Sequence, residues 1–276
     1  MSKLDENLWH RDESARAFWD QYQARPYQEL LEDTLCWAHP EAGEHWLDIG
    51  CGGGQLSGGL YRASGGTVGS IVAMDCAAAN VEAIDKLRDK LGIGDQPERI
   101  TFQQGDLSFG LPQFEDKSFD GVIAGLSLSY AESRDPLTGE YTDTAFKEVF
   151  REIIRVLRPG GRLVFSINVP EPNFWAIFWK SIWPLKRWRR PGRLLANIWE
   201  MQKVGTWLKV EALKGRFHYL QIEALRGVLL DAGFPAVEWR ETYANQAFVI
   251  RVEKPIEVKK PIEVKKPIEV KRAVAA

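Results

Sequence analysis

The sequence predicts an α/β protein in which a mainly parallel β-sheet carries helices on both of its faces. The first indication is a short apolar stretch that ends in an acidic residue and runs into four glycines within five positions, over residues 45–56. The second is the alternation of strand-like apolar runs with helix-like segments as far as residue 168. Such alternation is typical of parallel sheets covered by helices. A chain of 276 residues, 45% hydrophobic and 27% charged, is also long enough to bury one large core.

The elements are expected in the following order. Aromatic and apolar residues recur at helical spacing over 8–38, and Pro26 divides them into two helices of an N-terminal cap over residues 1–43. Tyr22 and Tyr27 of this cap are candidates to close over a bound cofactor, although core positions are the simpler interpretation. Further strands are expected at 71–75, 100–104, 119–126 and 162–168, and helices at 77–91, 144–157 and 222–232.

The glycine-rich turn after the first strand is the candidate ligand site. Glycines let the backbone adopt φ > 0 and let a ligand touch the main chain itself. The dinucleotide fingerprint G-x-G-x-x-G does not fit this turn. Counted from Gly50, the third glycine would fall at Gln55, and counted from Gly52 it would fall at Ser57. No P-loop sequence occurs either. The second strand ends in Asp75, where an acid is placed to hold a ribose diol.

The glycine turn also has a second spacing. The pattern D-x-G-x-G-x-G, formed by Asp48, Gly50, Gly52 and Gly54, resembles motif I of the class I S-adenosylmethionine-dependent methyltransferases. The resemblance extends over most of residues 44–168. It includes three further motifs, at 104–107, 118–120 and 157–161. Within that class, the chain looks like methyltransferase type 11 and the C- or O-methyltransferases of the ubiquinone/menaquinone type.

This resemblance implies both a fold and a cofactor. The fold would be a Rossmann-like sheet of seven strands, mostly parallel with the last strand antiparallel, ending in a hairpin at 237–241 and 246–252. The cofactor would be S-adenosylmethionine, with Asp75 on its ribose, Asp106 on its adenine amino group and Leu107 packed on the adenine ring. The cofactor-binding residues expected in this way are Asp48, Gly50, Cys51, Gly52, Gly54, Asp75, Cys76, Asp106, Leu107 and Leu126.

Methyl transfer from a sulfonium makes few chemical demands on the protein. It needs an aligned nucleophile in a dry pocket, and orientation alone can contribute about 7–11 kcal/mol. A general base is needed only when the nucleophile must lose a proton. The catalytic candidates are Tyr130, in the segment 127–130 expected beneath the methionine group, and His218, in the segment 215–220. A lone histidine beside two aromatic residues is more often structural, and this alternative stays open for His218.

Residues 171–217 are expected to form a basic, tryptophan-rich helical insertion. The segment 174–216 holds six of the eleven tryptophans, and ten lysines and arginines against two acids. Aromatic rings with clustered cations suit a membrane surface, whereas a lid over the pocket is the alternative, and the two are compatible. Nucleic acid is not expected as a partner, because Gly125-Leu126-Ser127-Leu128 stands where base-amino methyltransferases carry N-P-P-[YF].

The remaining features bear on location and boundaries. Cys36, Cys51 and Cys76 lack metal-binding spacing, so we expect no metal site and a reducing compartment. The N-terminus shows no apolar signal region, and no apolar run reaches the roughly 18 residues of a membrane span. A cytoplasmic protein is expected, with peripheral membrane attachment as an open alternative. A single domain at 1–253 would precede a disordered tail at 254–276, in which Lys-Pro-Ile-Glu-Val-Lys occurs three times.

Together these features predict an enzyme that transfers a methyl group from S-adenosylmethionine to a small or lipid-like hydrophobic acceptor. A quinone, a phenol, a sterol and a lipid amine are all compatible with the sequence. One alternative is methylation of a soluble acidic metabolite recognised by the basic insertion. Another is a cofactor-binding module at a membrane that has no catalytic turnover.

Overall fold

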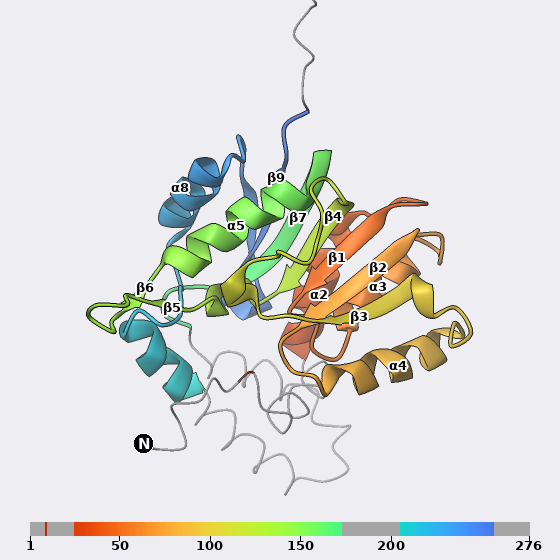
Figure 1. Ribbon diagram of the computed structural model, residues 1–276, viewed down its shortest axis with the longest axis horizontal. Helices are drawn as coiled ribbons and strands as arrows, with labels where there is room; N and C mark the ends of the chain where they lie inside the picture. The colour runs from red at the N-terminus through yellow and green to blue at the C-terminus, as the bar shows by residue number, and fades with distance from the viewer. Residues whose placement is uncertain (1–8, 10–24, 173–204, 257–276) are drawn as a thin grey trace, which may run out of the picture.

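The computed structural model describes residues 9, 25–172 and 205–256, and Figure 1 shows one twisted sheet with helices on both sides. The sheet has seven strands in the order β3-β2-β1-β4-β7-β9-β8. Strand β9 is antiparallel to both of its neighbours, whereas the other pairs are parallel. This confirms the predicted seven-stranded, mostly parallel sheet. The strands are β1 His45–Ile49, β2 Ser70–Asp75, β3 Ile100–Gln104, β4 Phe119–Gly125, β7 Leu157–Asn168, β8 Glu238–Thr242 and β9 Ala247–Glu253.

Two separate cores form because successive strand residues face opposite sides of the sheet. On one face, Leu47, Val122 and Phe165 pack against the apolar sides of α5 and α8, which lie together in Figure 1. On the other face, Trp46 and Ile123 pack against α2, α3 and α4. The helices are α2 Arg25–Ala38, α3 Gln55–Ala63, α4 Asn80–Leu91, α5 Thr144–Val156 and α8 Ile222–Ala232, and a further helix spans residues 205–213.

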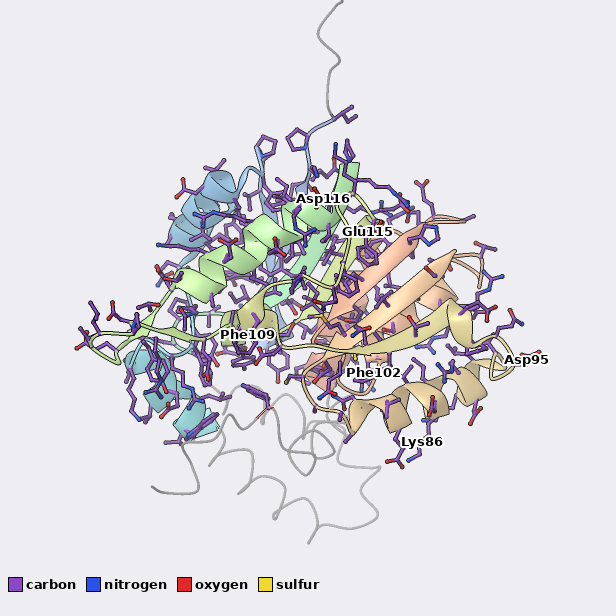
Figure 2. All side chains as sticks on the ribbon, in the orientation of Figure 1. Lys86, Asp95, Phe102, Phe109, Glu115 and Asp116 are labelled. Carbon is purple, nitrogen blue, oxygen red and sulfur yellow. The ribbon has the colours of Figure 1, made fainter. Side chains whose placement is uncertain are left out.

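Local rules account for several of the helix ends. Pro26 lies in the first turn of α2, where a proline needs no backbone N–H. Gly92 and Gly233 end α4 and α8 in the left-handed conformation. The outer face of α4 is polar, and Figure 2 shows Lys86 on that face, where it pairs with Glu82.

Several boundaries differ from the sequence-based expectation. Strand β7 begins at Leu157 rather than at 162, because Leu157 already pairs with Phe119 of β4 ahead of a register shift. Helix α4 begins at Asn80 rather than at 77. The final hairpin strands lie one residue further along the chain than expected. The segment 131–143, for which no strand is predicted, contains a small antiparallel pair formed by β5 Ser133–Arg134 and β6 Tyr141–Thr142.

Some expectations fall outside the described residues. They are the first cap helix with Tyr22, the part of the insertion from 173 to 204 and the repeats from 257 onward. None of the helices over 25–172 and 205–256 is both long and apolar enough to cross a membrane.

Candidate active site

The turn after β1 provides backbone rather than side chains at the carboxyl edge of the sheet. Gly50 and Gly52 have φ values of 71° and 50°, a region that side chains disfavour. A Cβ on Gly50 would lie 2.3 Å from the Cβ of Ser127, so that position admits only glycine. A Cβ on Gly52 would meet nothing within 4 Å, which leaves open space over this part of the turn. Gly54, also left-handed, then starts α3.

Asp48 lies beneath this turn and is fully buried. Its Oδ2 accepts hydrogen bonds from the backbone N–H (3.0 Å) and the hydroxyl (2.6 Å) of Ser57. Its Oδ1 has no partner among the residues described. Burial raises the pKa of Asp48 to about 7, against the lowering effect of Ser57, and the charge of Asp75 raises it further. A buried carboxylate with one free oxygen is a site where a cation would be favoured.

Asp75, at the end of β2, links two turns. Its Oδ2 accepts the N–H of Gly52 at 2.9 Å, and its Oδ1 accepts the N–H of Ala77 at 3.0 Å. Each carboxylate oxygen has a second lone pair, so the group can still accept from a diol. The carboxylate is therefore held in place at the position where the sequence predicts a ribose.

The other predicted cofactor residues lie at the ends of neighbouring strands. Asp106 follows β3 and caps the short helix η4 (Leu107–Phe109), accepting the N–H of Ser108 at 2.8 Å. The thiol of Cys76 lies 3.5 Å from the backbone oxygen of Trp9. Leu126 has a φ of 56°, held by hydrogen bonds from its N–H to Ser166. The fold thus brings the ends of β1, β2, β3 and β4 to one edge.

An aromatic cluster lies beside this edge, composed of Trp9, Tyr130, Trp207, Phe217 and Tyr219. The ring of Tyr130, from η5 (Leu128–Tyr130), is 4.4 Å from that of Trp9 and 5.0 Å from that of Phe217. The hydroxyl of Tyr219 donates to that of Tyr130 at 3.3 Å, and the side chain of Asn168, at the end of β7, lies close to both phenols. Burial raises the pKa of Tyr130, as does the nearness of Tyr219, so this phenol stays protonated at neutral pH.

The side chain of His218 contacts other residues than its two neighbours in the sequence do. Phe217 and Tyr219 contact Tyr130, whereas the imidazole of His218 stacks on Phe146 of α5, with 4.7 Å between ring centroids. Burial lowers the pKa of His218, which favours the neutral ring, and its Nε2 has no partner among the described residues. The rings of the two catalytic candidates, Tyr130 and His218, therefore stack on different partners, although the backbone N–H of His218 donates to the carbonyl of Ser129 at 3.0 Å.

Arg216 holds this segment to the loop after β4. Its guanidinium, 3% exposed, donates to Glu132 and, at 3.2 Å, to Glu211 in the helix over 205–213. It also lies over the rings of Trp207 and Phe217, at 5.7 Å and 5.4 Å. We refer to Arg216, Glu132 and Glu211 as the Arg216 clamp. It places Phe217 and Tyr219 against Tyr130.

Sequence reasoning missed several of these residues. Trp9 and Asn168 carried no motif, and Tyr219 was noted only as a neighbour of His218. The one available signal was position, because Asn168 ends a strand at the same edge as the predicted cofactor residues. In the described ranges, no group of three histidine, cysteine or acidic side chains is placed to hold a metal ion.

Comparisons with known proteins agree with this arrangement. Residues 40–224 match the model of a family described as methyltransferase domain. The chain is 29% identical over 170 residues to the demethylmenaquinone methyltransferase of Symbiobacterium thermophilum, covering 60% of this chain and 61% of that one. It is 30% identical over 220 residues to the ubiquinone/menaquinone biosynthesis C-methyltransferase of Pseudomonas aeruginosa, covering 78% of this chain and 74% of that one.

The solved structures show the same fold. A SAM-dependent methyltransferase from Aquifex aeolicus superposes with a TM-score of 0.53 at 15% identity, covering 88% of this chain and 98% of that one. The chain spans less than two thirds of the length of the first relatives that it matches.

Proposed function

The chain belongs to the methyltransferase-domain family and carries its S-adenosylmethionine-dependent domain, and we propose that it methylates a small, uncharged, hydrophobic acceptor such as a quinone or a phenol. The observation that carries this proposal is the aromatic cluster beside the cofactor edge, in which the hydroxyl of Tyr219 donates directly to that of Tyr130. Aromatic rings favour a flat apolar ligand, and hydroxyls orient an oxygen on it.

The turn after β1 fits the cofactor. The open space over Gly52 lets a ligand approach the backbone, and Oδ1 of Asp48 is a buried acceptor without a described partner. We propose that Asp75 holds the ribose and Asp106 the adenine, with Leu107 against the ring. When bound, S-adenosylmethionine supplies a methyl group on a positively charged sulfur.

The chain's own residues would act mainly by alignment. The aromatic cluster excludes water and fixes the plane of the acceptor, an effect worth up to about 7–11 kcal/mol when the reacting atoms are aligned. Tyr130 stays protonated, so it donates a hydrogen bond to the acceptor rather than removing its proton. Within the described residues, the guanidinium that lies over rings of the cluster, that of Arg216, is already paired with Glu132 and Glu211, which favours a neutral acceptor over an acidic one.

The test is transfer of a labelled methyl group into two extracts, one of lipids and one of polar metabolites. We expect label in the lipid extract, in an aromatic product. Label confined to the polar extract would overturn the hydrophobic acceptor in favour of a soluble metabolite. Label in neither, with tight S-adenosylhomocysteine binding, would indicate a module without turnover.

Asp75→Ala is expected to weaken S-adenosylhomocysteine binding by about 10- to 100-fold, since one hydrogen-bonded charge contributes about 1.5–3 kcal/mol. Titration calorimetry measures the change. Asp95→Ala is the matched control, because Asp95 lies in an exposed loop between α4 and β3 (Figure 2) and should leave affinity unchanged. Wild-type affinity in Asp75→Ala would refute the ribose contact.

A base role for His218 stays a prediction. A neutral imidazole with a lowered pKa is able to accept a proton at pH 7, but its ring stacks on Phe146 away from Tyr130. If it is the base, kcat rises with pH below neutrality and His218→Gln loses that rise. A His218→Gln profile that keeps the wild-type shape would leave the residue a structural role.

We also propose that the insertion 171–217 covers the acceptor and touches a membrane surface. The support lies in its described end, where Leu213 is 89% exposed on the helix over 205–213. Sedimentation with phosphatidylglycerol vesicles tests this, with phosphatidylcholine vesicles for comparison. Binding to the anionic vesicles alone is expected. No binding to either would restrict the insertion to a lid.

A further inference from the structure

A second pair of phenols approaches the aromatic cluster from a different part of the fold. Tyr27 lies in the first turn of α2, and Tyr243 lies at the tip between β8 and β9, in η7 (Tyr243–Asn245). Their ring centroids are 6.2 Å apart in an edge-to-face arrangement. Both rings pack against the same core as Leu126, which follows β4 at the cofactor edge.

These phenols also lie near the groups of the candidate site. The pKa of Tyr27 is raised to about 12 by burial and by the nearness of Asp48. The pKa of Tyr243 is raised by burial and by the nearness of Tyr27 and Tyr130. Within the described part of the chain, neither hydroxyl makes a hydrogen bond, in contrast to those of Tyr130 and Tyr219. Both are therefore protonated donors that are not engaged.

The backbone holds Tyr243 in place under strain. Tyr243, Ala244 and Asn245 have φ values of 55°, 59° and 63°, three consecutive non-glycine residues in the left-handed region. Each such residue is disfavoured, and strain of this kind concentrates at ligand sites. The tip is fixed to α2 because Arg240 and Thr242 both donate to the carboxylate of Asp33.

We propose that Tyr243, supported by Tyr27, is a specificity-determining residue whose hydroxyl binds a second oxygen of the acceptor, in addition to the one bound at Tyr130. The inference rests on the proposed function and deepens it. Two donors from separate elements, one after β4 and one at the β8–β9 tip, fit an aromatic ring that carries two oxygens. A ring with a single oxygen would satisfy only one of them.

The experiment compares two probes with the same ring system. 1,4-Naphthohydroquinone, kept reduced with dithionite, carries two oxygens, and 1-naphthol carries one. Tyr243→Phe should lower kcat/KM for the hydroquinone about tenfold, as expected for one lost hydrogen bond, and that for 1-naphthol less than about threefold. S-adenosylhomocysteine affinity should stay unchanged. Tyr61→Phe is the control, because Tyr61 lies near the far end of α3 from the glycine turn.

A second variant tests the turn that holds Tyr243 while keeping the Tyr243 hydroxyl itself. Ala244→Gly keeps Tyr243 but lets residue 244 adopt φ < 0 as readily as φ > 0, so the turn no longer fixes Tyr243 and discrimination between the two probes should fall while cofactor binding stays intact. Equal losses for both probes in Tyr243→Phe, or no loss, would overturn the specificity role. If the wild-type protein methylates neither probe, the proposed aromatic acceptor fails, and this inference fails with it.

Discussion

Asp48→Asn is expected to raise the melting temperature of the cofactor-free protein at pH 8 while weakening its binding of S-adenosylhomocysteine. The carboxyl of Asp48 is fully buried, and only one of its oxygens is hydrogen-bonded within the described ranges. Asparagine keeps an oxygen for the N–H and hydroxyl of Ser57 but carries no charge. In the cofactor-free protein, the substitution removes the cost of burying a charge and so stabilises the fold. In the complex, it removes a negative charge that attracts the ligand and so weakens binding.

The direction with pH follows from the two pKa values of Asp48. The folded pKa, about 7, lies above the ordinary value of 3.8, so the folded state binds the proton more tightly than the unfolded chain does. This group's contribution to stability is most favourable below the unfolded pKa. It declines as pH rises towards the folded pKa, then stays level. A difference of roughly three between the folded and unfolded pKa values corresponds to about 4 kcal/mol at pH 8.

The net gain in Asp48→Asn is smaller than that, because the new amide N–H₂ is buried and an unpaired donor costs about 1–3 kcal/mol. We expect a net stabilisation of about 1–3 kcal/mol at pH 8, which raises the melting temperature by about 2–5 °C. At pH 4 the gain should vanish. Thermal melts at the two pH values measure it.

Asp48→Asn is expected to weaken binding of S-adenosylhomocysteine, although it stabilises the cofactor-free protein. Wild-type affinity for S-adenosylhomocysteine should rise between about pH 6 and pH 7.5 as Asp48 ionises, and the variant should lose this rise. Asp95→Asn, on an exposed loop, controls for the change of net charge. Unchanged affinity in Asp48→Asn would remove Asp48 from the cofactor site, and a lower melting temperature at pH 8 would contradict the buried-charge argument.

The residues that sequence reasoning identified share one physical property. Asp48, Asp75 and Asp106 each lie at or just beyond the end of a strand, and the glycines between 50 and 54 form one short turn, so local spacing along the chain determines where they lie. Strands that alternate with helices place those ends at a single edge. The positions of these residues in the fold were therefore predictable without knowledge of long-range contacts, and the structure places them on the expected elements.

The aromatic cluster was not predictable as a whole, although Tyr130 itself was a candidate, for the complementary reason. Trp9, Tyr130 and Tyr219 come from positions far apart in the sequence, and their contact depends on how the insertion's end folds back. The position of Tyr243 depends on three consecutive left-handed residues, and none of them is a glycine that would predict such a turn from the sequence. The Arg216 clamp likewise joins residues 84 positions apart. No periodicity or motif encodes such pairings, so only a three-dimensional structure reveals them.

Arg216→Met is expected to destabilise the protein by about 2–4 kcal/mol, because removing one partner of a buried ion pair leaves the other charge uncompensated. Glu211, 6% exposed, would keep only Lys214, and Glu132 would lose its ion pair with Arg216. Burial alone would raise the pKa of Glu211, and its hydrogen bonds from Lys214 and Arg216 hold it below the ordinary value. Urea unfolding at neutral pH measures the loss. Arg151→Met is the control, since the Arg151–Glu148 pair is exposed and such pairs contribute at most about 1 kcal/mol.

The effect of Arg216→Met on catalysis shows whether the Arg216 clamp positions the aromatic cluster or only stabilises the protein. Without the Arg216 clamp, Phe217 and Tyr219 are no longer held against Tyr130, so KM for the acceptor should rise about tenfold or more. S-adenosylhomocysteine affinity should change less than about twofold, because none of the clamp residues lies in the glycine turn. The triple variant Arg216→Met, Glu132→Gln, Glu211→Gln removes the stranded charges, so much of the stability should return while KM stays raised. Recovery of both together would show that the clamp acts only through stability, and an unchanged KM in Arg216→Met would separate the aromatic cluster from acceptor binding.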